Sequence, residues 1–105
     1  MKNGSERGVF PELWISLASL LRSYTALHGL NGNRQATVEA DGRRIRVRFD
    51  ARTLDLERKG AKVSWQREDG SKGKLELTEA GRLRGSSGEE EMDMAAEAWA
   101  RELMQ

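Results

Sequence analysis

Residues 43–57 read RRIRVRFDARTLDLE, and the alternation in this stretch decides the fold. Along 43–49 every second residue is apolar and the residues between them are arginines, so a strand here has one apolar face and one charged face. Leu54 and Leu56 continue the alternation after a turn predicted at 50–53. The two strands can pair with both faces matched, which predicts an antiparallel hairpin with one face toward a core.

Further turn signals extend this hairpin into a meander. The predicted turns are Asp41-Gly42, Asp50 to Thr53, Lys59-Gly60, Asp69-Gly70-Ser71 and Glu79-Ala80-Gly81. They set apolar residues opposite one another: Val38 and Ile45, Val47 and Leu56, Leu54 and Trp65, Val63 and Leu77, Leu77 and Leu83. A slip of one residue would destroy these matches, so the pattern predicts a five- or six-stranded antiparallel sheet.

A helix is predicted on each side of the meander. Residues 10–28 have apolar residues at helical spacing, with Pro11 in the first turn and Gly29 suited to a left-handed conformation after the last. The stripe comprises Phe10, Leu13, Leu17, Leu20, Leu21, Tyr24, Leu27 and His28, with Trp14 at its edge. Ser87 and Glu90 have the spacing of a capping box, which predicts the start of a second helix. Its narrower stripe comprises Met92, Ala95, Ala96, Trp99 and Leu103.

The alternate strand face is polar throughout, so both helices are expected to cover the apolar face. The predicted fold is therefore α+β, with an N-terminal helix, the meander and a C-terminal helix forming a two-layer sandwich or a half barrel. A chain of 105 residues suits a single domain over 1–105, with 1–8 frayed at the end.

Composition excludes several classes of chemistry. The chain has no cysteine, so thiol catalysis and thiolate metal sites are ruled out and a cytoplasmic location is expected. The apolar run from Leu13 to Leu21 is shorter than the roughly 20 residues of a membrane span, and no membrane partner is expected. A single histidine, His28, leaves no paired-histidine metal site. We expect no catalytic residues, no metal and no cofactor.

Charge is unevenly distributed along the chain. Residues 34–74 contain twelve Lys or Arg against seven acidic residues, whereas 86–105 contain one Arg against six. Arg44, Arg46 and Arg48 lie on one strand face, where their guanidinium groups could bind phosphates. The favoured interpretation is a solvated face, with the arginines paired across the sheet to Glu39, Asp55 and Glu57. Nucleic acid therefore remains an alternative partner.

Tryptophans offer two further hypotheses. Trp14, Trp65 and Trp99 come from three different elements and could line a pocket for a small apolar ligand, although filling the core is the favoured role. Trp14, Ile15 and Ala18 could instead form a subunit contact on the first helix. The leading hypothesis is a non-enzymatic protein-interaction module that forms a homodimer. The alternatives are a polyanion binder and a carrier of apolar ligands.

Overall fold

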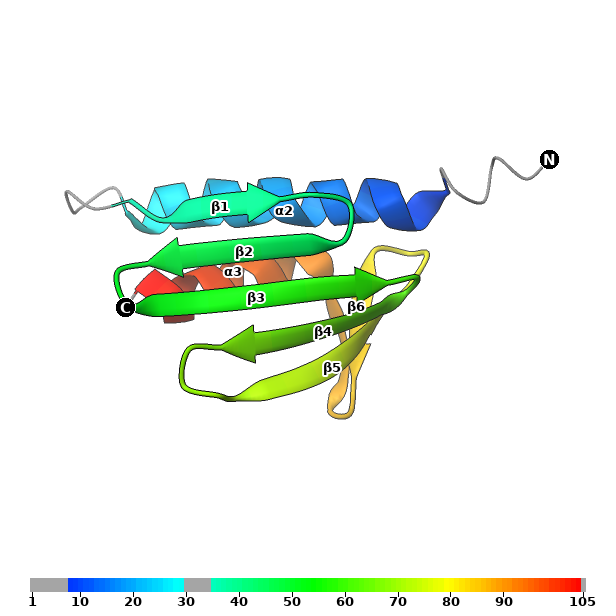
Figure 1. The fold of residues 1–105 in the computed structure, drawn as a ribbon. Helices are drawn as coiled ribbons and strands as arrows, with labels where there is room; N and C mark the ends of the chain where they lie inside the picture. Colours follow the sequence, from blue (N-terminus) through cyan, green and yellow to red (C-terminus); the bar gives the residue numbers. More distant parts are fainter. Residues whose placement is uncertain (1–7, 30–34, 105) are drawn as a thin grey trace.

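The computed structural model describes residues 8–29 and 35–104. These residues form two helices and one seven-stranded antiparallel sheet, so the fold is α+β as predicted (Figure 1). The elements in chain order are α2 (Val9–His28), β1 (Thr37–Ala40), β2 (Arg44–Phe49), β3 (Arg52–Lys59), β4 (Lys62–Arg67), β5 (Lys72–Leu77), β6 (Arg82–Gly85), β7 (Gly88–Glu91) and α3 (Met92–Met104). The predicted loop 29–34 and frayed segment 1–8 fall largely outside the described residues.

The sheet has seven strands, one more than the larger of the two predicted numbers, five and six. Its order is β1-β2-β3-β4-β5-β6-β7, so every strand pairs with its neighbours in the chain. The additional strand is β7, and it occupies the residues for which the capping-box spacing predicted a helix start, so that prediction was wrong. Gly85 pairs with Gly88, whose φ of 136° only glycine adopts readily, and a tight hairpin forms. Helix α3 therefore begins only at Met92.

Strand pairing keeps the predicted faces but shifts most partners by two residues. Observed pairs are Val38 with Val47, Val47 with Leu54, Leu56 with Trp65, and Val63 with Leu75, in place of the predicted partners. The pairing of Leu77 with Leu83 is confirmed. Because side chains alternate with a period of two, a shift of two residues leaves each apolar residue on the core face.

Hydrogen bonds and backbone conformation explain where two of the turns lie. The Asp41 carboxylate accepts hydrogen bonds from the backbone N–H groups of Arg43 and Arg44, each at 2.8 Å, which also lower the pKa of Asp41. Asp41 therefore precedes the turn, and Gly42 and Arg43 form it. In the next hairpin Asp50 adopts φ 55°, a conformation that aspartate tolerates better than most residues, and the turn shortens to residues 50 and 51.

The two helices pack against each other, and Figure 1 shows α2 behind β1 and α3 behind β2 and β3. The Tyr24 hydroxyl of α2 donates to Asp93 Oδ1 of α3 at 2.5 Å, and His28 Nε2 lies 3.2 Å from Glu97 Oε2. Helix α2 also contacts β1, and α3 contacts β3, β6 and β7. Figure 1 shows β4 and β5 extending beyond the helices, so the expected cover of one face holds for only part of the sheet.

The buried side of α2 differs from the predicted stripe. It comprises Trp14, Leu17, Ala18, Leu21 and Thr25, whereas Leu27 is exposed. Trp14 can be buried because its indole N–H donates to the Asp41 carbonyl at 3.0 Å. Gly29 follows the helix with φ −89°, so the left-handed conformation predicted there is not adopted. Neither described helix has the length and apolarity of a membrane span.

Candidate functional site

Among the hollows that the described residues form against strands β4 and β5, two are lined by Trp65, one involving each face of the sheet. The first, which we call the outer hollow, measures about 590 Å³ and is lined by residues of β2 to β5. The second, which we call the tryptophan groove, measures about 810 Å³ and lies between α3 and strands β4 to β7. Both volumes fall in the range of ligand sites, so each hollow is a candidate site.

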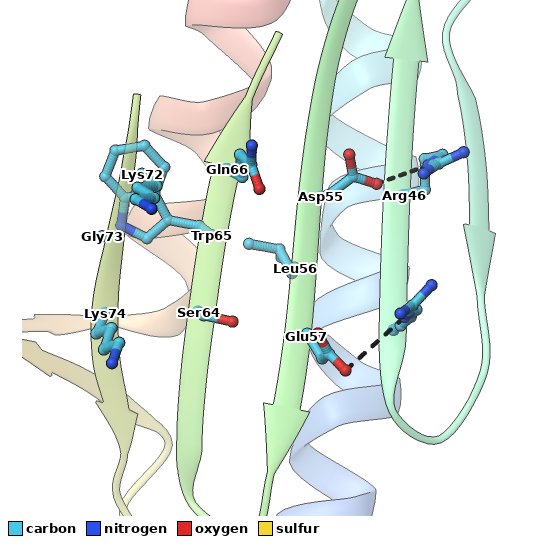
Figure 2. Close-up of a pocket in the computed structure, with 11 residues that line it drawn as sticks. Arg46, Asp55, Leu56, Glu57, Ser64, Trp65, Gln66, Lys72, Gly73 and Lys74 are labelled. Atoms are coloured by element: carbon cyan, nitrogen blue, oxygen red, sulfur yellow. Dashed lines mark hydrogen bonds and ion pairs between the residues drawn. The ribbon is translucent and has the colours of Figure 1, made fainter. Parts of the chain in front are cut away.

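The outer hollow is lined mainly by polar side chains (Figure 2). Arg46 Nε lies 2.6 Å from Asp55 Oδ1, and this hydrogen bond raises the pKa of Arg46. Arg44 Nε lies 3.9 Å from Glu57 Oε2. Arg44 and Arg46 are therefore paired with carboxylates, but not with the predicted partners, which were Glu39 for Arg44, Glu57 for Arg46 and Asp55 for Arg48. These ion pairs occupy donors that a phosphate would need.

Free positive charge in the outer hollow comes from lysines instead. Lys72 and Lys74 alternate along β5 on the same face as the arginines, and neither forms an ion pair with a described residue. Arg48 lies opposite Thr37 and Thr53 and does not line this hollow. The sequence interpretation assigned no site to these lysines, although their alternation in KGKLEL places both on one face of the strand.

The tryptophan groove is lined by the part of the core face that the helices leave open. Trp65 and Leu75 come from the sheet, and Trp99 and Ala98 come from α3. All four are partly exposed, and Trp65, Leu75 and Trp99 pack against the buried core. The groove therefore presents two indole rings and an aliphatic side chain to solvent, and all three pack against the buried core.

Gly73 determines where the Trp65 ring lies. Gly73 pairs directly with Trp65 across the β4–β5 ladder, and Figure 2 shows the ring alongside Gly73. A Cβ atom at this position would lie 2.6 Å from Trp65 Nε1, closer than real contacts allow. The absence of a side chain lets the indole lie flat against β5, which is why Trp65 lines both hollows.

Polar residues border the groove on two sides. Arg67 Nη1 lies 3.5 Å from Glu102 Oε1, and its Nε contacts Glu68 Oε1 at 3.4 Å and the Thr53 carbonyl at 3.2 Å. Glu89 and Glu90 of β7 line the opposite side. The capping-box spacing predicts a helix at Glu90, whereas in the structure Glu90 lies in β7 opposite Leu83.

The three residues predicted to form a subunit contact on α2 do not share one exposed surface. Trp14 and Ala18 are buried in the core at 1% and 3% exposure, whereas Ile15 is 66% exposed. Of the three tryptophans predicted to line one pocket, Trp65 and Trp99 meet in the groove. Trp14 lies apart from them, with the Arg58 guanidinium 5.9 Å from its ring centroid.

Other chemistry-bearing residues have structural contacts. His28 joins the two helices through Glu97, which also binds Arg101 at 2.6 Å. Among residues 8–29 and 35–104, no group of three or more His, Asp or Glu side chains is placed to hold a metal ion. No model of a known protein family, no curated protein and no solved structure matches this chain. Function is therefore inferred from the geometry alone.

Proposed function

We propose that this protein is a small non-enzymatic interaction module that binds an apolar segment of a partner protein in the tryptophan groove. The observation that carries the proposal is that Trp65 and Trp99, both partly exposed, line one open groove of about 810 Å³. Tryptophan is the residue type most enriched at the energetic centres of protein interfaces. Its large ring gains binding energy while only two side-chain torsions are ordered.

Support also comes from the packing that positions the two tryptophans of the groove. Trp65 is held by its packing against Gly73, and Trp99 is held by α3, which packs on α2. A site whose side chains are already positioned loses less conformational entropy when a partner binds. The partner is either a second copy of the chain or a different protein; the homodimer expected from the sequence used the first helix, not this groove.

Replacing Trp99 by serine is expected to weaken partner binding about 30-fold, the loss typical of a central tryptophan. Two measurements test this. Native mass spectrometry reports whether the wild-type protein is a dimer, and selection from a displayed library of random peptides reports whether it binds other polypeptides. The function is supported if the wild-type protein forms a dimer, or binds selected peptides, and the Trp99→Ser variant does not.

Two control variants show whether binding is lost because the groove is altered or because the protein unfolds. Ile15→Ser removes an exposed apolar side chain outside the groove and should leave binding unchanged. Ala98→Gln fills the groove without removing a core side chain, and it should abolish binding while urea unfolding stays close to that of the wild type. The function is refuted if the protein is monomeric and no selected peptide is sensitive to Ala98→Gln.

The outer hollow supports polyanion binding as a second candidate function. Lys72 and Lys74 carry charges that no described carboxylate pairs with, and they line the same hollow as Arg44 and Arg46, from which β3 and β4 separate them. Reversal of both lysines to glutamate is expected to abolish binding to single-stranded nucleic acid, and wild-type affinity should fall steeply with salt. The matched double variant Arg44→Glu and Arg46→Glu is expected to have the smaller effect, because these arginines are already paired. Wild-type affinity independent of salt would exclude this candidate.

A carrier of small apolar ligands is the third possibility and uses the same groove. Its volume would hold a small molecule against the two indoles. Native mass spectra of gently purified protein decide between the two uses, since a carrier retains an added small-molecule mass that Ala98→Gln removes.

A further inference from the structure

The groove carries a net negative charge at its border. Glu90 and Glu102 line it together with one cation, Arg67, whereas the side chain of Glu89 lies on the other face of the sheet beside Arg84. Arg67 is already compensated, because its guanidinium lies within 3.5 Å of carboxylate oxygens of both Glu102 and Glu68. Its side chain is only 16% exposed and also donates to the Thr53 carbonyl, so it is held in place.

Glu90 is the groove residue whose charge is least balanced. It forms no ion pair with any described residue, while its neighbour Glu89 has Arg84 at 4.0 Å. Glu90 lies opposite Leu83 in the β6–β7 pairing, which places it on the core face of the sheet, where the groove opens. A carboxylate beside apolar surface is a favourable position for a cation brought by a partner.

The aromatic rings point to the same partner chemistry independently of the carboxylates. Indole faces attract ammonium and guanidinium groups through the charge distribution of the ring, and Trp is the strongest of the aromatic residues in this respect. The chain already contains one such contact, between Arg58 and Trp14. Trp65 and Trp99 therefore favour a cationic occupant, as Glu90 does.

We propose that the occupant of the groove is a basic amphipathic segment of a different protein, with apolar side chains against Trp65, Leu75 and Trp99 and a Lys or Arg beside Glu90. This inference rests on the proposed function and names the partner class. A symmetric dimer formed through this groove would bring the same acidic border from both copies together, and like charges disfavour that arrangement.

The test uses two synthetic peptides without tryptophan that share one amphipathic leucine pattern and differ only in carrying lysine or glutamate at the polar positions. Binding to the full chain is measured by tryptophan fluorescence at low and high salt. The lysine peptide is expected to bind at least tenfold more tightly than the glutamate peptide, and the difference should shrink as salt is raised.

Two charge-reversal variants supply the matched comparison. Glu90→Lys is expected to weaken binding of the lysine peptide about tenfold, because attraction is replaced by repulsion. Glu12→Lys makes the same change in net charge on an exposed position of α2 outside the groove and should leave binding within about twofold of the wild type. Ala98→Gln should abolish binding of the lysine peptide.

The outcomes separate this inference from the function on which it rests. Equal affinity for the two peptides, no binding of the lysine peptide, or equal effects of Glu90→Lys and Glu12→Lys would each overturn the inference. If binding of library peptides were still abolished by Ala98→Gln, the proposed function as an interaction module would be retained. A stable dimer that Ala98→Gln disrupts would show that the occupant of the groove is a second copy of the chain and not a basic segment of another protein.

Discussion

Replacing Trp14 by alanine is expected to lower the free energy of unfolding by about 3–5 kcal/mol, the range for removing a large aromatic side chain from a core. Trp14 is 1% exposed, and its indole N–H satisfies the Asp41 carbonyl at the start of the first hairpin. The substitution would leave a cavity beneath the sheet and remove the only hydrogen bond in which the Trp14 side chain takes part among the described residues. Urea denaturation followed by circular dichroism measures the effect.

Two further variants separate the contribution of the Trp14 hydrogen bond to stability from that of its buried ring. Trp14→Phe retains most of the buried ring but loses the N–H donor, so it should cost less, about 1–3 kcal/mol. Ile15→Ser changes the adjacent, exposed position and should alter stability by no more than about 0.5 kcal/mol. Equal stability of the Trp14→Ala and Ile15→Ser variants would contradict a core role for Trp14.

Gly73→Ala is expected to lower the free energy of unfolding by about 1–3 kcal/mol, as overpacking does, and to move the Trp65 ring toward solvent. A methyl group here would lie within 2.8 Å of three ring atoms of Trp65, so the ring must shift. Emission of Trp65 should move to longer wavelength, and peptide binding in the groove should weaken. Urea denaturation and fluorescence on the same sample report both effects.

Gly42→Ala is the matched glycine substitution. Nothing lies within 4 Å of a Cβ atom at Gly42, and its backbone does not require a positive φ. Alanine there restricts only the unfolded chain, so stability should stay equal or rise by less than about 1 kcal/mol. If Gly73→Ala behaved like Gly42→Ala, the contact between Gly73 and the Trp65 ring would not govern the position of the indole.

The faces of the sheet were predictable because alternation depends only on the spacing of residues along each strand. Leu56 belongs to the core with either Val47 or Ile45 opposite, so the error in register left its burial unchanged. The register itself was not predictable, because it depends on hydrogen bonds within the turns. The two backbone N–H groups that bind Asp41 shift the first turn by one residue, and aspartate at position 41 is compatible with either arrangement.

The candidate site was predicted less well, because it depends on contacts between distant segments. The residues Glu89 to Glu91 suit both the first turn of a helix and an exposed edge strand, so local preference did not decide between them. The strand is favoured by the glycine pair at 85 and 88 and by Arg82, whose Nη2 lies 3.2 Å from Glu91 Oε2. Because the sequence does not predict β7, it also does not predict the groove that opens between the sheet and α3.

The strictly sequential order of the seven strands has a consequence for how the chain folds. Each hairpin joins residues close in the sequence, so the meander can grow by local steps with little loss of chain entropy. The contacts between α2 and α3 are different, since Tyr24 and Asp93 are 69 residues apart. Docking of the two helices is therefore expected to follow formation of the hairpins, and truncating α3 should speed unfolding far more than it slows folding.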